Sequence, residues 1–347
     1  MQYQKVFINN FAYELPHEVV SSEDVEELLA PVYKKLHIPK GQVEALTGIK
    51  ERRWWPENQM VSTGATVAAE KSLRKAGLKA SDLDALIFAG VCRDYFEPAP
   101  ACRIGANLGL KASAVAYDIS NACLGVMNGI LDIANRIELG QIQAGMVVSC
   151  ETSRDVTLDI INQLKQTPEM DLFKTSLATL TGGSGAAAVL LTSQNIGQSQ
   201  HQLVGGVTHS ALEHHDLCRW GVRKMPQVSM LEQFFIADAV SVLKFGLSLG
   251  AKTWSLLMQE LGWCREIVDK VISHQVGRAH RTSILQSLGI PEDMDFPTFE
   301  YLGNIGTVSL PLTAAMAGER GFLSRGDQVG LLGIGSGLNC LMMGVKW

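Results

Sequence analysis

The sequence predicts an α/β fold on the strength of three observations. The chain of 347 residues is 46% hydrophobic and 19% charged, which is the balance of a packed globular protein. Short apolar runs rich in β-branched residues alternate with longer amphipathic stretches, as in βαβ units. A strand, a turn and a helix then recur in the second part of the chain. Because single cores stop growing at roughly 250–300 residues, we expect two related halves.

The apolar spacing places the individual elements. Buried strands are predicted at residues 86–91, 146–149, 186–191, 271–273 and 329–333. Helices are predicted at residues 62–76, 124–138, 236–261 and 310–320. Glycines at or next to the ends of these helices are expected to terminate them in a left-handed conformation: Gly77, Gly140, Gly262 and Gly321. The alternation of strands and helices predicts mostly parallel strands.

An internal repeat predicts the domain organisation. Residues 82–91 resemble residues 267–276, because each has an acidic lead-in, a buried strand and a polar or small turn. Further on, Cys123 and Asn304 each lie in a turn that leads into a helix and then a strand. We therefore predict an N-terminal half at residues 1–195 and a C-terminal half at 196–347. A pseudo-two-fold axis between them would bring both turns into one cleft.

Composition excludes several classes of function. With 30 Lys and Arg against 35 Asp and Glu, the net charge is −5, and we expect no nucleic-acid partner. No apolar run reaches the roughly 18 residues of a membrane-spanning helix. The seven cysteines form no CxxC pair and follow no secretory signal, which predicts reduced thiols in the cytoplasm and no metal site.

Cys123 is the candidate nucleophile. It follows a strand-like segment and precedes a helix rich in small and apolar residues, the setting of a nucleophile on a tight turn. At a helix N-terminus, the macrodipole should lower the pKa of the thiol from about 8.5. A buried structural cysteine is the alternative, and general frequencies favour it for any single cysteine.

Three further segments could complete a site. His274 follows a predicted parallel strand, where side chains point into the ligand crevice of an α/β sheet; a structural histidine is the alternative. Asn304 lies in a Gly-Asn-Ile-Gly turn and could equally be an N-cap. Residues 333–337 form a glycine-rich run at the end of the last predicted strand, which could offer backbone N–H groups to an oxyanion or form a simple turn.

Together these segments resemble the thiolase superfamily, and within it the ketoacyl-ACP synthase III branch, over essentially the whole chain. The resemblance is carried by Asn121-Ala122-Cys123, His274-Gln275, Gly303-Asn304 and residues 333–337, which occur in the order of the family. Residues 92–98, 217–219 and 334–340 further resemble the members that join two fatty acyl-CoA molecules. The resemblance implies a five-layered αβαβα thiolase fold and a homodimer.

The resemblance also implies roles for individual residues. Cys123 would take the acyl group of a first acyl-CoA as a thioester. His274 and Asn304 would bind the thioester oxygen of a second acyl-CoA, and so stabilise its enolate. The backbone N–H groups of Cys123 and Ser336 would form a second oxyanion hole. No cofactor is implied, because acyl-CoA is a substrate.

Glu97 is the implied base for the α-proton, reaching the active site from the neighbouring subunit. An exposed loop carboxylate is the alternative, and the sequence alone favours it. Pro98 and Pro100 would stiffen the loop. The family motif His-Gln-Ala-Asn is replaced here by residues 274–277, His-Gln-Val-Gly. That change argues against docking of an acyl carrier protein and favours acyl-CoA substrates.

Three functions follow from these residues. The first is non-decarboxylative Claisen condensation of two long-chain acyl-CoA molecules to a 2-alkyl-3-oxoalkanoic acid, the first step of long-chain olefin biosynthesis, with downstream pathway enzymes as partners. The second is a decarboxylative synthase that uses a malonyl donor. The third is a non-catalytic scaffold subunit. The joint presence of Cys123, His274 and Asn304 argues against the scaffold, and Glu97 favours the first function over the second.

Overall fold

The computed structural model describes residues 1–196, 201–224 and 231–347. Within these ranges, one nine-stranded sheet has the order β11-β12-β13-β8-β1-β7-β6-β4-β5. Its strands are β1 (Val6–Glu14), β4 (Ala85–Ala89), β5 (Val115–Ile119), β6 (Ala144–Glu151), β7 (Gly185–Ser193), β8 (His201–Ser210), β11 (Lys270–Ser273), β12 (Gln328–Gly335) and β13 (Asn339–Lys346). All five predicted strands are therefore present.

The strand pairing shows the predicted duplication. In the N-terminal half, β7 pairs antiparallel with β6, and β6 and β5 flank β4 in parallel. In the C-terminal half, β13 pairs antiparallel with β12, and β12 is parallel to β11. A parallel bridge from Val271 to Asp295 occupies the position that β5 has in the first half. The halves join where β1 pairs with β8. The boundary between 195 and 196 stays a prediction; it lies next to residues that are not described.

The prediction of mostly parallel strands is wrong. Among the named strands of the described chain, only β4 with β5, β4 with β6, and β11 with β12 pair in parallel. The strands β1, β8 and β13 were not predicted, and all their pairings are antiparallel. β12 and β13 are separated only by residues 336–338, too few for a crossover helix, so they can only form a hairpin.

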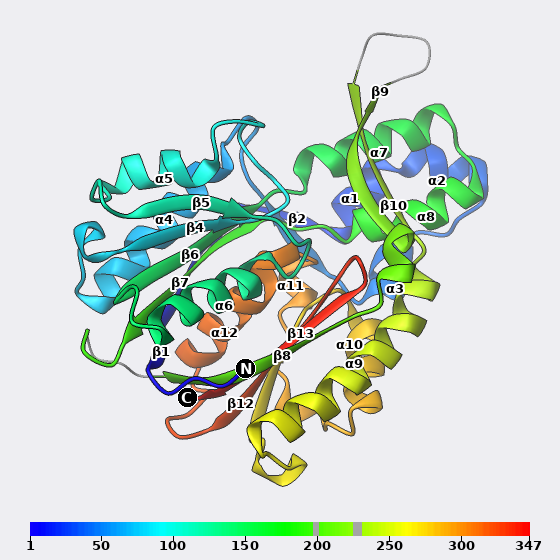
Figure 1. Ribbon diagram of the computed structural model, residues 1–347. Coiled ribbons are helices and arrows are strands. Elements are labelled where there is room, and N and C mark those ends of the chain that lie inside the picture. Colours follow the sequence, from blue (N-terminus) through cyan, green and yellow to red (C-terminus); the bar gives the residue numbers. More distant parts are fainter. Residues whose placement is uncertain (197–200, 225–230) are drawn as a thin grey trace.

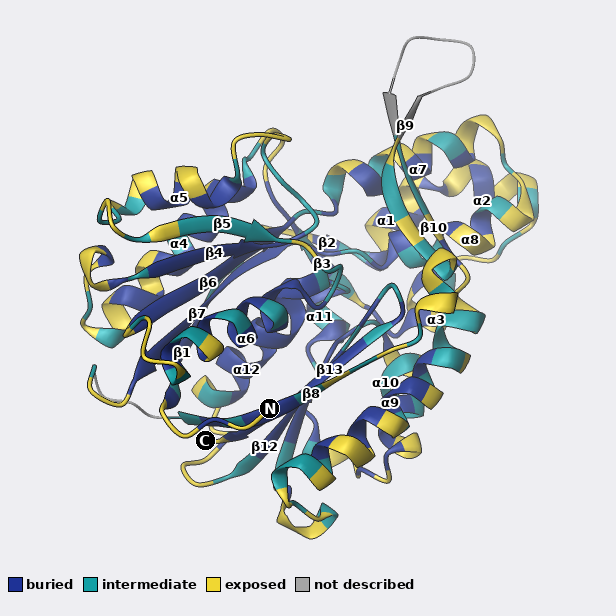
Figure 2. Cartoon of the chain, in the orientation of Figure 1, coloured by how far each residue is buried: buried dark blue, intermediate teal, exposed yellow. Residues whose placement is uncertain are grey.

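Helices cover the sheet and divide its two halves, which gives the five layers (Figure 1). The helices α6 (Gly125–Glu138) and α12 (Ser309–Glu319) lie between the two halves and share one core with both. The outer face of the N-terminal half is covered by α4 (Val61–Ala76) and α5 (Pro100–Leu108). The outer face of the other half is covered by α9 (Ala239–Leu261) and α10 (Arg278–Ser287). The neighbouring strands β4, β6 and β7 of the sheet are buried along their whole length, and α12 is buried over most of its length (Figure 2).

Smaller elements pack around this centre. A separate core joins α1 (Ser22–Leu28), α2 (Ala30–Leu36), α7 (Arg154–Gln166) and α8 (Met170–Leu180). Two further antiparallel strand pairs are β2 (Glu18–Ser21) with β3 (Glu51–Trp54) and β9 (Cys218–Lys224) with β10 (Leu231–Ala237). The remaining elements are α3 (Gln42–Thr47), α11 (Phe299–Leu302), and the 3-10 turns η1 (Ala80–Asp82), η2 (Leu212–Leu217), η3 (Arg265–Ile267), η4 (Glu292–Met294) and η5 (Gly306–Val308). In the described residues, no helix is long and apolar enough to cross a membrane.

The predicted helix ends are confirmed, with one correction at a start. The four predicted stop glycines have φ between 64° and 72°, the left-handed region that glycine adopts without strain. The helix predicted from residue 236 begins later, at Ala239, because Ile236 belongs to β10. The Asp238 side chain caps the start of the helix by accepting the Ser241 N–H at 3.0 Å.

Gly183 is a close contact between the two halves. Its N–H donates to the Asn304 carbonyl oxygen at 2.9 Å, and the Asn304 N–H donates to the Thr181 carbonyl oxygen at 2.9 Å. A Cβ atom on Gly183 would lie 2.0 Å from the carbonyl oxygen of Leu302. Because that atom belongs to the backbone, the two segments could not keep this approach with any side chain at position 183.

We therefore expect Gly183→Ala to lower the free energy of unfolding by about 1–3 kcal/mol, the usual cost of overpacking. Gly105→Ala is the matched control, because a Cβ there meets only ordinary contacts at 3.4 Å or more inside a helix. That control should be neutral or slightly stabilising, since alanine favours helix more than glycine. Urea unfolding of both variants checks this, and equal stability would contradict the close contact.

Candidate active site

Cys123 lies in the turn between β5 and α6, just before the helix begins at Gly125. Ala122 has φ of 45°, which is uncommon for a residue with a Cβ and marks a sharp, strained turn. The Leu124 N–H closes the turn by donating to the Asn121 carbonyl oxygen at 2.9 Å. This geometry presents Cys123 at the N-terminus of a buried helix, as the sequence predicts.

The expected lowering of the Cys123 pKa is wrong. Burial raises the pKa of the thiol to about 12, and the neighbouring Cys218 and Glu151 raise it further by repelling negative charge. Any stabilisation by the helix N-terminus is smaller than this desolvation. At neutral pH, Cys123 is therefore a protonated thiol, and it must lose its proton as it attacks a substrate.

Asn304 lies in the turn that precedes α12. Its side-chain Oδ1 accepts the Gly306 N–H at 3.1 Å, while its backbone is bound to residues 181 and 183. Oδ1 is thus occupied, and in the described residues the amide Nδ2 donates to no other group. Asn304 therefore offers a fixed N–H donor to a ligand.

The turns of Cys123 and Asn304 are joined directly. The Val126 N–H, in the first turn of α6, donates to Thr307 Oγ1 at 2.8 Å. Gly125 packs on the same hydroxyl, because a Cβ there would lie 3.5 Å from Thr307 Oγ1. The two helix N-termini therefore meet, as the internal repeat predicts. Thr307 was not predicted as part of the site, although its place three residues after Asn304 was a usable signal.

His274 directly follows β11 and is 5% exposed. The backbone N–H of His274 donates to the Leu332 carbonyl oxygen at 2.9 Å. This hydrogen bond continues the pairing of β11 with β12. Burial lowers the pKa of His274 to about 3, and nearby His280 contributes to the lowering. His274 is therefore neutral at physiological pH and can act as a hydrogen-bond donor through one ring N–H.

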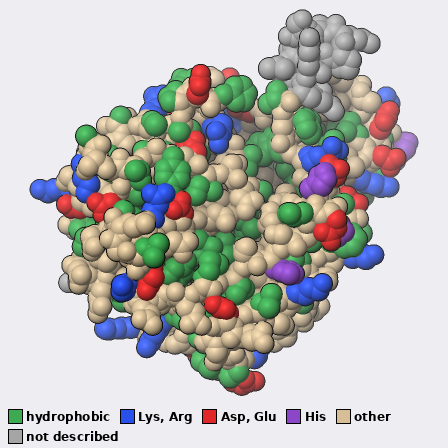
Figure 3. Space-filling view, viewed as in Figure 1, with side chains coloured by type: hydrophobic (Ala, Val, Ile, Leu, Met, Phe, Trp, Pro, Cys, Tyr) green, Lys and Arg blue, Asp and Glu red, His purple; other side chains and the backbone are tan. Residues whose placement is uncertain are grey.

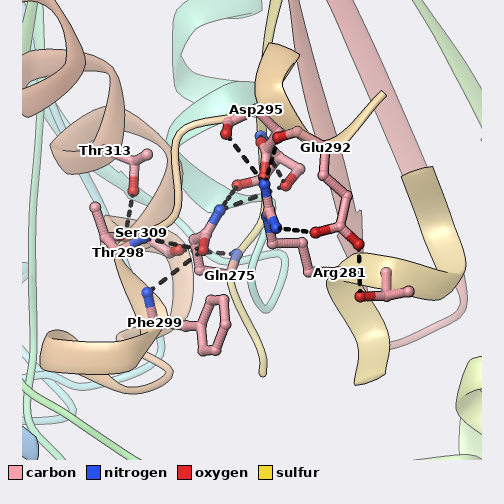
Figure 4. A network of polar contacts seen from close by, with 10 residues as sticks. Gln275, Arg281, Glu292, Asp295, Thr298, Phe299, Ser309 and Thr313 are labelled. Carbon is pink, nitrogen blue, oxygen red and sulfur yellow. Dashed lines mark hydrogen bonds and ion pairs between the residues drawn. The ribbon is translucent and has the colours of Figure 1, made fainter. Parts of the chain in front are cut away.

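Gln275 fixes the segment that carries His274 (Figure 4). Its Oε1 accepts the N–H groups of Thr298 and Phe299 at 3.2 and 3.4 Å. Its Nε2 donates to the Ser273 carbonyl oxygen at 3.2 Å, and its own N–H donates to Ser309 Oγ at 3.0 Å. Gln275 thereby ties the end of β11 to α11 and α12.

A buried ion pair supports the same segment. Asp295 has a fully buried side chain, whose Oδ2 accepts from Arg281 Nε at 2.6 Å. Its Oδ1 accepts the N–H and the hydroxyl of Ser273 at 3.1 and 2.9 Å. Burial raises the pKa of Asp295, opposed by Arg281 and Ser273. The hydrogen bonds to both carboxylate oxygens offset part of the desolvation, and they hold the end of β11 in place.

His280 also faces this interior, although the sequence did not single it out as a site residue. With His274, Gly250 and Ile284 it lines a cavity of about 10 Å³, and its buried Nδ1 has no hydrogen-bond partner among the described residues. Burial lowers the pKa of His280 to about 4. Ile284 was the missed signal: a buried residue four positions on in α10 places His280 on the same helix face.

Ser336 lies in the turn between β12 and β13, against Cys123. A Cβ on neighbouring Gly335 would lie 3.4 Å from the Cys123 nitrogen. Asn339 Nδ2 spans the two turns, with the Ser336 carbonyl oxygen and Asn121 Oδ1 both at 3.4 Å. No hydrogen bond between described residues uses the N–H of Cys123 or of Ser336. Both N–H groups are thus available to a ligand.

Glu97 lies apart from this cluster. It is exposed, in the loop between β4 and α5, and it accepts no hydrogen bond in the described part of the chain. Tyr95 and Phe96 beside it are 51% and 87% exposed. Within one chain, the structure therefore joins the turn of Cys123 to the turns of Asn304 and Ser336, and leaves Glu97 at the surface.

Comparisons with known proteins agree with this architecture. The thiolase N-terminal domain family matches residues 56–166, and the C-terminal family of 3-oxoacyl-[acyl-carrier-protein] synthase III matches residues 258–347. A β-ketoacyl-[acyl-carrier-protein] synthase III of Natranaerobius thermophilus is 27% identical over 96% of both chains. The fold and the site thus define a condensing enzyme of the thiolase superfamily.

More similar relatives narrow this class. An acyl-CoA:acyl-CoA alkyltransferase of Shewanella oneidensis is 53% identical over the whole of both chains, and one of Xanthomonas campestris is 36% identical over the same span. The structure of Xanthomonas campestris OleA with bound lauric acid and lauroyl-CoA has a TM-score of 0.92 at 34% identity, covering 99% of this chain and 100% of that one. The chain belongs to the acyl-CoA:acyl-CoA alkyltransferases, the family of OleA.

The raised pKa of Cys123 predicts how its reactivity depends on pH. Thiolate is the reactive form, so alkylation by iodoacetamide should rise about tenfold per pH unit from about pH 7 to 9, without a plateau. Peptide mass spectrometry would follow Cys123 separately from the exposed Cys102 and Cys264, and Cys123→Ser gives the background. A plateau below pH 8 would show that the helix N-terminus outweighs burial.

Proposed function

We propose that this enzyme condenses two long-chain acyl-CoA molecules, without decarboxylation, to a 2-alkyl-3-oxoalkanoic acid. The observation that carries the proposal is the junction of the two helix N-termini, which sets Cys123 beside Asn304. The family supports it, since the 53% identical relative is named an acyl-CoA:acyl-CoA alkyltransferase. The decarboxylative alternative has weaker support, because the synthase III relative is only 27% identical.

In the first step, Cys123 Sγ attacks the thioester carbonyl of one acyl-CoA. The thiol proton leaves as the sulfur–carbon bond forms, and coenzyme A departs as its thiol. The backbone N–H groups of Cys123 and Ser336 are free to donate to the oxyanion of the tetrahedral intermediate. The product is an acyl-cysteine thioester.

In the second step, a second acyl-CoA loses an α-proton to the Glu97 carboxylate. The electron pair moves onto the thioester oxygen, where His274 and Asn304 donate hydrogen bonds to the enolate. A neutral His274 can fill this role, because a neutral imidazole keeps one ring N–H as a donor. Because both donors are held in place, little reorganisation is needed as charge develops.

In the third step, the enolate carbon attacks the acyl-cysteine carbonyl. A carbon–carbon bond forms, the sulfur–carbon bond breaks, and Cys123 is released to take back a proton. Hydrolysis of the remaining thioester yields the 3-oxo acid and the second coenzyme A. The thioesters supply the activation throughout, and we propose no cofactor.

We further propose a cytoplasmic homodimer in which Glu97 serves the partner subunit. The free state of all seven cysteines supports a reducing compartment. The exposure of Phe96 supports a covered position in an assembly, since an aromatic side chain that is 87% exposed leaves its apolar surface in water. Acidic and basic side chains are interspersed on the face shown in Figure 3, which fits the absence of a nucleic-acid partner. Enzymes that consume the 3-oxo acid in olefin biosynthesis are the proposed downstream partners.

Incubation with a single long-chain acyl-CoA tests the function. Without malonyl-CoA, we expect the 2-alkyl-3-oxo acid by mass spectrometry, with two molecules of coenzyme A released for each product. Cys123→Ser should form neither acyl-enzyme nor product. If product appears only after malonyl-CoA is added, the decarboxylative alternative is right.

Glu97→Ala tests the base and its subunit. Acylation of Cys123 should continue, while condensation should fall about 10²- to 10⁴-fold, the usual contribution of a general base. Co-expression of Glu97→Ala with Cys123→Ala should restore activity in mixed dimers, because one subunit keeps the cysteine and the other supplies the glutamate. Absence of restored activity in the mixture would place Glu97 in the active site of its own subunit. Normal condensation by Glu97→Ala would remove it as the base.

A further inference from the structure

Glu151 is a buried carboxylate with no role in the steps above. It is the last residue of β6 and only 5% exposed. Its Oε1 accepts the Val91 N–H at 2.9 Å, and its Oε2 accepts the Cys92 N–H at 3.1 Å. Val91 and Cys92 are at the start of the loop that carries Glu97. Glu151 therefore binds the root of that loop with both carboxylate oxygens.

The other face of Glu151 contacts the turn of Asn304. A Cβ on Gly306 would lie 3.4 Å from Glu151 Cγ, and a Cβ on Gly90 would lie 3.2 Å from Glu151 Oε1. Gly306 is also the residue whose N–H binds Asn304 Oδ1. Glu151 thus fills the space between the start of the Glu97 loop and the turn of Asn304, and its size sets their separation.

Two further carboxylates hold the loop beyond its root. Asp94 Oδ1 accepts the Ser62 N–H at 3.1 Å. Asp118 accepts the Ala101 N–H at 3.2 Å, and its second oxygen lies 3.7 Å from Arg93 Nη1. Residues 91–94 and 101 are therefore fixed, while residues 95–98 are exposed between them. The loop presents Glu97 from a held base.

We propose that Glu151 is a positioning residue for Glu97: by accepting two N–H groups at the root of the loop, it sets where the base is presented for enolate formation. This inference rests on the proposed function, in which Glu97 removes the α-proton. Glu151 is buried and both its oxygens are occupied, so it contacts no substrate. Its positioning effect should therefore slow only the step that uses Glu97, whereas its charge, which raises the pKa of Cys123, does not favour acylation.

Glu151→Gln is the principal test, because it keeps the shape but turns an N–H₂ group toward a backbone N–H. We expect condensation to slow about 10- to 100-fold, the range caused by small misplacement of a catalytic group. Acylation, followed as the first release of coenzyme A, should be no slower than in wild type, because the neutral glutamine no longer raises the pKa of Cys123. The double variant with Glu97→Ala should condense no more slowly than Glu97→Ala alone, because both changes remove one function.

Glu26→Gln is the matched control. Glu26 is also 5% exposed and accepts two backbone N–H groups at the start of α3, from Gly41 at 2.5 Å and Val43 at 2.8 Å, but it contacts none of the site residues. It should lower thermal stability as Glu151→Gln does, and leave both steps unchanged. Gly90→Ala perturbs Glu151 without replacing it and should slow condensation in the same selective way, even if Glu151→Gln does not fold.

The experiments distinguish a failure of the positioning role of Glu151 from a failure of the proposed condensation function. If wild type makes no product from acyl-CoA alone, the proposed function fails. If wild type condenses and Glu97→Ala does not, but Glu151→Gln condenses normally, the positioning role fails. Equal slowing of acylation and condensation in Glu151→Gln and in Gly90→Ala would also overturn it, since that result indicates a general effect on the fold.

Discussion

The site depends on the hydrogen bond between Val126 N–H and Thr307 Oγ1, where the N-termini of α6 and α12 meet between the two halves of the sheet. The duplication makes this contact possible, because each half contributes an equivalent turn. Orphan N–H groups at a helix start must find partners when they are buried. Here one is satisfied by the other half, and the turns of Cys123 and Asn304 are held together as a consequence.

Burial of this junction determines the charge state of the site. Desolvation keeps Cys123 as a thiol and His274 as a neutral ring, so no charge has to be balanced there before substrate arrives. Charges nearby are tolerated only where they are fully bonded, as in the contact of Asp295 with Arg281 and Ser273. The interior therefore supplies fixed neutral donors, which suit an oxyanion that exists only during reaction.

Much of this arrangement could be predicted from the sequence, and the failures have physical causes. Short apolar runs rich in β-branched residues identified β4, β6, β7, β11 and β12. The internal repeat placed Cys123 opposite Asn304. The antiparallel strands were missed because pairing direction depends on connections rather than on composition. The pKa of Cys123 was predicted with the wrong sign because its burial, and the further effect of Cys218 and Glu151, arise from tertiary packing that the local sequence does not report. Glu97 could be assigned only by resemblance, since an exposed loop carboxylate has no local signal.

The same division between interior and surface explains why the base should come from a loop. A carboxylate within the buried donor cluster would be desolvated, and both of its oxygens would need hydrogen bonds to offset that cost. Glu151 shows what such burial requires, since both its oxygens are bonded. A carboxylate that must accept a proton in each catalytic cycle cannot have both of its oxygens held by hydrogen bonds in this way. Glu97 escapes this conflict because it is presented from outside, by a loop whose root is fixed while its tip remains free of protein hydrogen bonds in the described chain.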